Sequence, residues 1–490
     1  MRSSALTLLL AAVAAALACA GSASGAGIGV NDDSAKYADD GGAWFFGEAK
    51  RLGLRQVVIS NRFRPGEPAR LQEEELLDRT LASADRARID VVLAVYPYPP
   101  REFQLGGIDL EAFGSYLDRL ARRHPEVREY VIGNEPNQPA FWRPLFEPGG
   151  AVASAAQAGA LLAWSYDTLK AVDPMLRVIG LGVSPRGNDN PLAPSNASIS
   201  PVRFIQALGR WYRASGRTTP LMDGFSFHPY PNSAADPLDR GYAWPNAGFV
   251  NLDRVKQALW DAFQGTAQPT TVNGLQLHLD ELGWQVDTSW NTAYTGQENV
   301  RVTSEAQQAA IYAEVVRRAA CDPAIAAVNF FGLDDDSARD LGWQAGLYRA
   351  DRSPRPAVEA VEGAVEETAR NGCAGDVTMW RPAQRVVGAW AGGAHAGRNG
   401  HVSVRLAAGE GARAVACVLA ASGSVSPTRL VRRMEQASAT RAGCRSLALT
   451  PMRRPHVRLA APSAARRYVG VRFTADANPG RSSTVVVRVH

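Results

Sequence analysis

Short apolar runs alternate with helix-like segments over the first three quarters of the chain. Several runs are apolar without alternation, which is typical of strands that helices cover on both faces. The predicted strands are Gly27–Val30, Gln56–Ser60, Asp90–Tyr96, Tyr130–Gly133, Arg177–Val183, Gly224–His228, Leu275–Leu279 and Ala326–Phe331. Apolar residues at helical spacing predict helices at Leu71–Arg88, Leu110–His124, Ala151–Val172, Pro201–Ala214, Leu252–Phe263 and Ser304–Cys321. Residues 26–370 are therefore predicted to form an α/β fold, a (β/α)8 TIM barrel. A doubly wound open sheet is the weaker alternative, because no G-x-G-x-x-G motif follows the first strand.

The pattern changes after Cys373. Residues 376–490 hold short alternating runs separated by Gly, Ser, Pro and Asn, which predict a C-terminal all-β sandwich domain. The predicted strands of this domain are His401–Leu406, Ala414–Leu419, Val457–Leu459, Tyr468–Phe473 and Thr484–Val489.

The first 25 residues are predicted to be a signal peptide. Arg2 precedes an apolar run from Leu6 to Ala18, which is too short to span a bilayer, and Ala18-Cys19-Ala20 resembles a cleavage site. We therefore expect a secreted or extracytoplasmic protein without a transmembrane segment. A cell-surface lipoprotein anchored at Cys19 is the minor alternative, because Ala16 stands where a branched apolar residue is expected.

The remaining cysteines predict disulfides. Cys321, Cys373, Cys417 and Cys444 form an even set in an oxidising compartment. Four cysteines allow three connectivities. The domain organisation favours Cys321 with Cys373 and Cys417 with Cys444, since each pair then stays within or close to one domain.

Composition is that of a globular protein, with 46% hydrophobic and 21% charged residues, and it excludes disordered, collagenous and polytopic membrane classes. The net charge of +5 is unevenly divided. Residues 376–490 carry eighteen arginines and four acids, a net charge of +14, so the remainder of the chain carries −9. The basic tail either docks on an anionic cell-surface polymer or packs against the acidic barrel. Nucleic acid is not expected as a partner, because no recognition motif accompanies the basic residues.

Two glutamates stand where predicted barrel strands end. Asn134-Glu135-Pro136 follows the fourth strand and Asp280-Glu281-Leu282 follows the seventh. Reacting groups of such barrels lie at the strand ends, and strands four and seven face each other across the barrel. Two carboxylates about 5 to 5.5 Å apart suit glycoside hydrolysis with retention of configuration. We expect Glu135, with a raised pKa, to be the general acid and base, and the ionised Glu281 to be the nucleophile. The Asn134 amide can donate to the sugar 2-hydroxyl.

At these residues the sequence resembles the clan A retaining glycoside hydrolases, nearest to the cellulase-like family 5 and the xylosidase-like family 39. The likeness consists of Asn134-Glu135-Pro136, Phe227-His228-Pro229-Tyr230 and Glu281-Leu282-Gly283-Trp284. The resemblance implies that His228 and Tyr230 position Glu281 and the substrate, and that Arg62 is an active-site arginine. It implies a carbohydrate substrate.

One departure concerns the floor of the first sugar subsite. Many clan members end strand eight with a Trp, whereas Val328-Asn329-Phe330-Phe331-Gly332 holds two Phe. Trp343 or Trp284 are the candidate substitutes. Among the loop aromatics, Trp284 and Trp142 are the predicted sugar-stacking residues.

The predicted function is that of an exported glycosidase that acts as a monomer and needs no cofactor or metal ion. The alternative is a non-catalytic carbohydrate-binding protein on a glycosidase-like barrel. Retention of both glutamates favours the enzyme.

Overall fold

The computed structural model describes residues 25–100, 107–340, 342–377, 379–397, 400–421, 425–440, 443–451, 453–460 and 466–490. Apart from Gly25, the predicted signal peptide lies outside the described residues. Among the helices that are described, none is both long and apolar enough to cross a bilayer.

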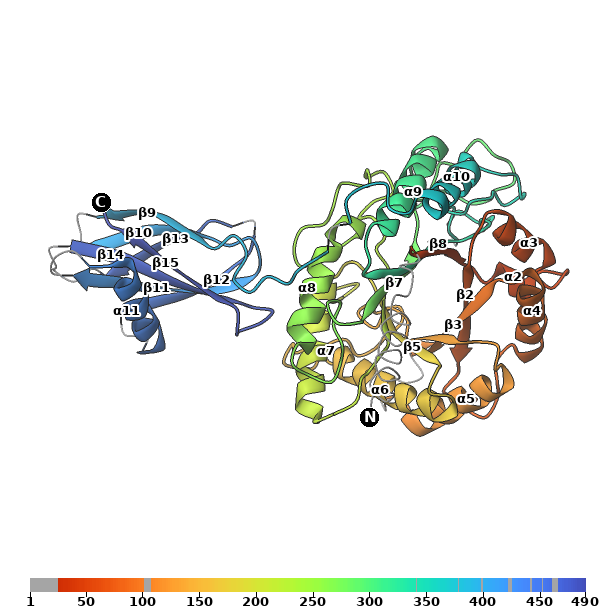
Figure 1. Cartoon of the computed structure of the whole chain (residues 1–490), viewed down its shortest axis with the longest axis horizontal. Coiled ribbons are helices and arrows are strands. Elements are labelled where there is room, and N and C mark those ends of the chain that lie inside the picture. Colours follow the sequence, from red (N-terminus) through yellow and green to blue (C-terminus); the bar gives the residue numbers. More distant parts are fainter. Residues whose placement is uncertain are drawn as a thin grey trace, which may run out of the picture.

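Eight parallel strands close into the predicted barrel (Figure 1). The strands are β1 (Gly27–Asn31), β2 (Gln56–Phe63), β3 (Asp90–Pro97), β4 (Glu129–Ile132), β5 (Arg177–Val183), β6 (Gly224–Phe227), β7 (Gln276–Leu282) and β8 (Ile325–Phe331). Pairing of β1 with β8, from Gly27 opposite Ala327 onward, completes the ring. Gly29 permits close packing at this seam, because a Cβ there would lie 2.5 Å from Oδ1 of Asn329 in β8. The sequence prediction of a TIM barrel is confirmed.

Helices surround the barrel and bury their apolar faces against it (Figure 1). They are α2 (Ser34–Tyr37), α3 (Ala43–Arg51), α4 (Glu74–Ala87), α5 (Leu110–Arg123), α6 (Ser154–Val172), α7 (Pro201–Ser215), α8 (Leu252–Phe263), α9 (Glu305–Ala320) and α10 (Pro356–Asn371), with a 3₁₀ turn η2 (Phe249–Asn251). The six predicted helices agree with α4 to α9 to within about one turn. The short helices α2 and α3 were not predicted.

The C-terminal domain is a two-sheet antiparallel sandwich. One sheet has the order β13-β10-β9 and the other β12-β11-β14-β15. The strands are β9 (Trp390–Ala396), β10 (His401–Ala407), β11 (Ala412–Ala421), β12 (Cys444–Leu449), β13 (His456–Ala460), β14 (Arg466–Ala475) and β15 (Ser482–Arg488). Val404, Phe473 and other apolar residues from both sheets form its own core. The prediction of a sandwich is confirmed, although one helix, α11 (Pro427–Thr440), also packs on β11, β14 and β15.

Both favoured disulfides are present. Cys321, which caps the end of α9, is bonded to Cys373, and Cys417 of β11 is bonded to Cys444 of β12. The first disulfide lies where the chain leaves the barrel, and the second joins two paired strands within the sandwich.

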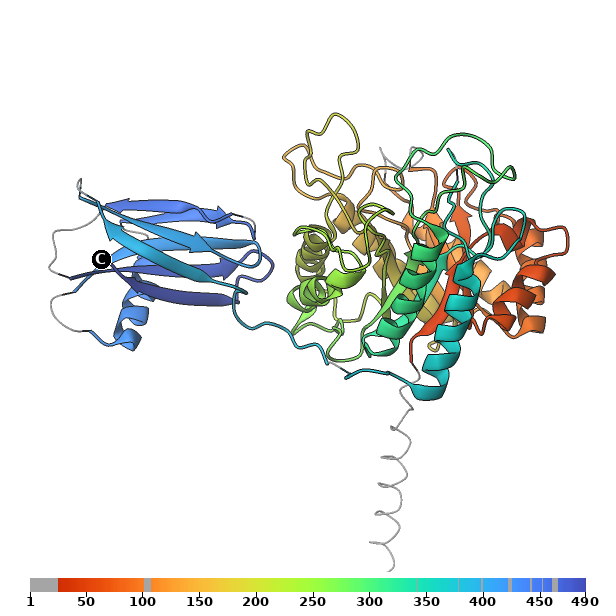
Figure 2. The same cartoon turned by 90° about the horizontal axis from the view of Figure 1, so that it is seen from above.

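The sandwich lies beside the barrel, on the side of α7 and α8 (Figures 1 and 2). A buried ionic contact joins the two domains. Arg481 lies 3.0 Å from the Asp261 carboxylate of α8 and 2.7 Å from Glu410 of its own domain. Arg481 and Asp261 are almost completely buried, and Asn478 also donates a hydrogen bond to Asp261. The Trp244 ring covers Gly411, where a Cβ would come within 2.2 Å of it. The domains are thus fixed by specific contacts as well as by the linker.

Candidate active site

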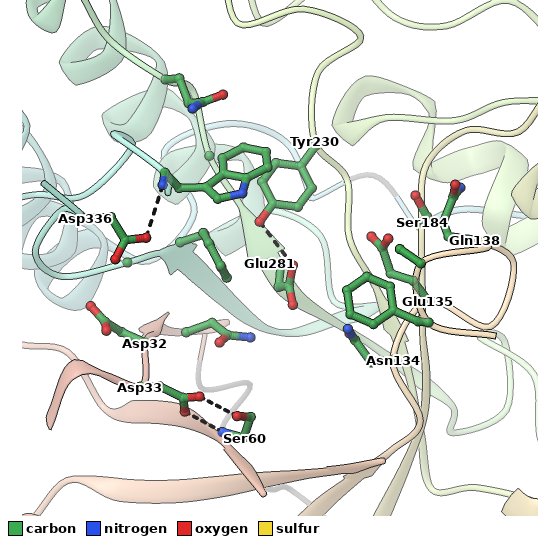
Figure 3. Close-up of a pocket in the computed structure, with 18 of the residues that line it drawn as sticks. Asp32, Asp33, Ser60, Asn134, Glu135, Gln138, Ser184, Tyr230, Glu281 and Asp336 are labelled. Atoms are coloured by element: carbon green, nitrogen blue, oxygen red, sulfur yellow. Dashed lines mark hydrogen bonds between the residues drawn. The ribbon is translucent and has the colours of Figure 1, made fainter. Parts of the chain in front are cut away.

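A pocket of about 1270 Å³ opens at the carboxyl ends of the barrel strands (Figure 3). Its lining includes residues from the ends of β1, β2, β3, β7 and β8 and from the loops that follow β4, β5 and β6. Asn134, Glu135, Tyr230, Glu281 and Arg62 are among the lining residues. The fold therefore brings these five predicted site residues to one cavity.

Glu135 is held by a sharp turn after β4. Gly133 has φ 94°, and Glu135 itself has φ 39°, a left-handed conformation that is uncommon for residues other than glycine. The Glu135 N–H donates a 2.9 Å hydrogen bond to the Gly182 carbonyl of β5. This turn directs the Glu135 carboxylate into the pocket, where 16% of the side chain is exposed.

Glu281 lies within β7 and faces Glu135 across the pocket (Figure 3). The Tyr230 hydroxyl donates a 3.1 Å hydrogen bond to Glu281 Oε2. His228 Nδ1 lies 3.2 Å from Glu135 Oε1 and 3.5 Å from Glu281 Oε2. Carboxylate oxygens of the two glutamates lie within 4.8 Å of each other. One imidazole nitrogen thus bridges two opposed carboxyl groups.

Burial and the charges of this cluster shift the pKa values of His228 and Glu281. Burial lowers the pKa of His228, but the carboxylates of Glu281 and Glu135 outweigh it and raise the pKa to about 9. Burial raises the pKa of Glu281 to about 7, with the nearby Glu135 adding to the rise and His228 opposing it. The sequence assigned the raised pKa to Glu135 and expected Glu281 to ionise readily. The structure raises the pKa of Glu281, because the pocket buries its carboxyl group beside like charges, so the expectation that Glu281 ionises readily is wrong.

Arg62 and Asn134 lie at the pocket wall. Arg62, near the end of β2, donates through Nε to the Tyr96 hydroxyl at 3.2 Å, and its guanidinium lies 5.4 Å from the Tyr98 ring centre. These contacts hold the guanidinium in the cavity without a paired carboxylate among the described residues. Asn134 precedes Glu135 directly and points toward the same space (Figure 3).

The prediction that Trp284 and Trp142 stack on sugar rings is wrong. Trp284 is 2% exposed and donates through its indole N–H to the Asp236 carbonyl, while Trp142 is 1% exposed and donates to Gln157. Neither lines the pocket, because both indoles pack in the interior behind it. A position next to a motif or in a loop of the sequence does not determine the direction in which the side chain points.

Trp343 and Phe331 supply the aromatic surface instead. Trp343 is 40% exposed and lines the pocket. Its ring centre lies 5.0 Å from that of Tyr230. Phe331 of β8 lies 5.6 Å from Trp343. The loop that follows β8 therefore gives the pocket an exposed indole beside Phe331 and Tyr230.

An acidic wall beside β1 and β8 includes Asp32, which was missed in the sequence. Asp32 accepts from the backbone N–H groups of Ser34 and Leu333 at 2.7 Å, and Ser34 Oγ donates to Asp334. Burial and the neighbouring Asp334 raise the pKa of Asp32 to about 8. The available signal was the position of both acidic segments directly after strands that meet at the barrel seam.

Glu135, His228 and Glu281 also form a group of three donor side chains within 4.8 Å that could hold a metal ion. The same donor atoms already contact one another, since His228 Nδ1 faces both carboxylates. The arrangement therefore places one basic side chain between two acidic ones.

Comparison with known proteins returns similar solved structures. No family model matches the chain, and no curated protein matches its sequence. A family 39 glycoside hydrolase from Bacteroides cellulosilyticus WH2 is 15% identical, with a TM-score of 0.48 over 89% of this chain and 80% of that chain. A GH39 β-xylosidase from Caulobacter crescentus is 14% identical, with a TM-score of 0.46 over 89% and 96%. An endo-β-1,4-mannanase from Thermotoga petrophila is 11% identical, with a TM-score of 0.43 over 95% and 97%.

Proposed function

We propose that this chain is an exported retaining glycosidase that hydrolyses O-glycosidic bonds in a polysaccharide or oligosaccharide. The observation that carries the proposal is the pair of carboxylates, from the β4 loop and from β7, with oxygens within 4.8 Å of each other in an open pocket. This separation suits a nucleophile that attacks directly, because an inverting pair must leave more room for a water molecule.

In the proposed mechanism, Glu281 attacks the anomeric carbon while Glu135 donates a proton to the departing glycosidic oxygen. A covalent glycosyl-enzyme forms as the C–O bond to the leaving group breaks. Glu135, now a carboxylate, removes a proton from water, which attacks the anomeric carbon and releases Glu281. The exchange of one proton by Glu135 balances the two steps.

The neighbouring groups support this division of roles. The Tyr230 hydroxyl stabilises the Glu281 carboxylate by a hydrogen bond, and the cationic His228 lowers the pKa of Glu281 against the effect of burial. In this proposal Asn134 donates to the sugar 2-hydroxyl, and Arg62 binds another hydroxyl. Trp343 offers a ring face to a pyranose or furanose. We further propose that the enzyme acts as a monomer.

Azide rescue tests the assignment. Against a panel of aryl glycosides, we expect Glu281→Ala to lose activity and azide to restore it with formation of the glycosyl azide of inverted configuration. Glu135→Ala should lose about 10²–10⁴-fold on poor leaving groups and far less on activated ones. Its azide product should retain the substrate configuration. Glu111→Gln, an exposed glutamate on α5, is the matched control. Wild-type rates in both alanine variants would refute the proposal.

The second candidate is a non-catalytic carbohydrate-binding protein on the same barrel. It is favoured only by the raised pKa of Glu281, which reduces the nucleophilic carboxylate at acidic pH. Saccharide binding without turnover between pH 5 and 9 would support this alternative.

A further inference from the structure

The outer face of the three-stranded sheet in the sandwich is a basic and aromatic surface. Strand register places its side chains together: Arg405 is opposite His456, and Ser403 lies opposite both Arg458 and His395. Directly opposed residues of antiparallel strands project from the same face. We call this surface the basic face and define it by its exposed residues Trp390, His395, His401, Arg405, His456 and Arg458.

The other face of the same sheet fixes this orientation. Val402, Val404 and Leu406 of β10 alternate with the exposed residues, and they are fully buried in the sandwich core. A slip of one residue would expose these apolar side chains and bury Arg405. The positions of the basic residues on the surface therefore follow from the stability of the core.

Two glycines in β9 bring the polar and aromatic groups together. The Trp390 indole covers Gly392, where a Cβ would lie 2.3 Å from Cζ2 of the ring. At Gly393, which has φ 58°, a Cβ would lie 3.8 Å from His395 Nε2 and 4.0 Å from Arg405 Nε. Gly392 lies opposite Arg405 across the strand pair. The indole, one imidazole and one guanidinium thus converge on a short stretch of sheet.

The positive charges of the basic face have no acidic partner among the described residues. Neither Arg405 nor Arg458 forms a salt bridge, and β9, β10 and β13 contain no Asp or Glu. Two of the four acids in residues 376–490 are engaged elsewhere: Glu410 binds Arg481, and Asp476 lies near Arg413 and Arg203. Unpaired cations on a flat surface attract anions more strongly than cations within ion-pair networks do.

We propose that the basic face is a binding site for an anionic polysaccharide, separate from the pocket of the barrel. Guanidinium groups bind carboxylates with directed hydrogen bonds, and the exposed Trp390 provides a ring face for a sugar. The six exposed residues that define the basic face include one large aromatic side chain, Trp390, and no aliphatic side chain that could insert into a bilayer. A glycan that bears carboxylates matches both the charge and the ring.

Affinity for polygalacturonate tests the proposal in the full chain. The probe is measured by affinity electrophoresis and by titration calorimetry, with neutral dextran as the uncharged comparison. We expect salt-sensitive binding to polygalacturonate and at least tenfold weaker binding to dextran. Arg405→Gln combined with Arg458→Gln should weaken polygalacturonate binding at least tenfold and reduce its salt dependence. Trp390→Ala should weaken binding severalfold and leave the salt dependence intact.

A second double variant controls for net charge. Arg429→Gln combined with Arg432→Gln removes two exposed charges from α11, which covers the opposite sheet. We expect at most a twofold effect. An equal loss in both double variants would overturn the site, because net charge alone would then explain the binding. Circular dichroism and thermal unfolding of each variant ensure that folded proteins are compared.

Two further measurements decide the class of partner. Binding to phosphatidylglycerol vesicles or to single-stranded DNA that equals polygalacturonate binding, and is lost in the same Arg405 and Arg458 variant, would overturn the assignment to a polysaccharide. The outcome is independent of hydrolysis. A chain that binds polygalacturonate through the basic face but cleaves no glycoside refutes the proposed enzyme alone, and the reverse result refutes the basic face alone.

Discussion

His228 and Tyr230 determine the charge state of Glu281 from two directions. The imidazole lies 3.2 Å from Glu135 and 3.5 Å from Glu281, whereas the Tyr230 hydroxyl donates a hydrogen bond to Glu281. Both interactions favour the carboxylate form of Glu281, and burial opposes them. At the scale of single residues, the balance of these opposing effects sets the pH at which the proposed nucleophile becomes available.

Tyr230→Phe should shift the acid limb of the pH profile of kcat/KM. The wild-type kcat/KM is expected to rise through about pH 7, where the free enzyme loses the Glu281 proton. Loss of the hydroxyl removes a hydrogen bond to the charged form, so the limb should move upward by about one pH unit. Tyr242→Phe is the matched control, since its hydroxyl donates to the Tyr230 carbonyl and not to a carboxylate. An unmoved limb in Tyr230→Phe would contradict the role of Glu281.

His228 predicts a fall in stability at alkaline pH. Its pKa is raised from 6.5 to about 9, so the folded state holds a proton that the unfolded chain has released between these values. This stabilisation is complete below pH 6.5 and is lost as the pH rises through 9, by at most about 3 kcal/mol. Denaturant unfolding should show this fall in the wild type and in the exposed-site control His456→Asn. His228→Asn should flatten it, and an unchanged slope in that variant would exclude His228 as the source.

At the scale of elements, Arg355 joins three segments that shape the pocket. It precedes α10, pairs with Asp335 of the loop after β8 at 2.5 Å, and contacts Glu305 at the start of α9 at 3.2 Å. Arg355 and Asp335 are completely buried. The same loop carries Trp343, so the ion pair anchors the segment that supplies the aromatic surface.

Arg355→Met should therefore destabilise the barrel strongly. Asp335 would keep a buried carboxyl group without its cation, at a cost of about 3–5 kcal/mol in the free energy of unfolding. The control is Arg370→Met, which breaks the exposed pair with Glu366 and should cost less than about 1 kcal/mol. Chemical denaturation measures both. Equal effects would show that the buried pair has no special role.

The elements differ in how far the sequence could predict them. The barrel strands were predictable because continuous apolar runs such as Arg177–Val183 report burial on both faces. Helix α11 was missed because its charged residues leave only Leu430 and Met434 buried. The glutamates were predictable from strand ends, but the choice of Trp343 over Trp284 was not. Which Trp faces the pocket depends on how the loop after β8 folds over Tyr230. Local sequence patterns do not predict such long-range contacts.

At the scale of the whole molecule, one salt bridge joins the acidic barrel to the basic sandwich among the residues that the structure describes. Arg481 is shared between Asp261 of the barrel and Glu410 of the sandwich. Most arginines of the sandwich are not used in this contact. Packing against the barrel therefore does not account for the charge of +14 in residues 376–490.

Arg481→Met should loosen the sandwich from the barrel. Two carboxylates would lose their shared cation, and the burial that already raises the pKa of Asp261 would then be uncompensated. We expect faster proteolysis between residues 372 and 389 and a larger radius of gyration by X-ray scattering. Arg488→Met, an exposed change on β15, should leave both unchanged. Identical protease sensitivity of the two variants would mean that the linker alone holds the domains together.

The disulfide between Cys321 and Cys373 has a mechanical consequence. Cys373 lies just after α10, between the barrel and the linker to the sandwich, and its partner caps α9. If the sandwich holds a polymer, tension transmitted along the chain reaches this covalent cross-link before it reaches α10. The load then passes into two helices side by side, and the strand ends that carry Glu135 and Glu281 are spared.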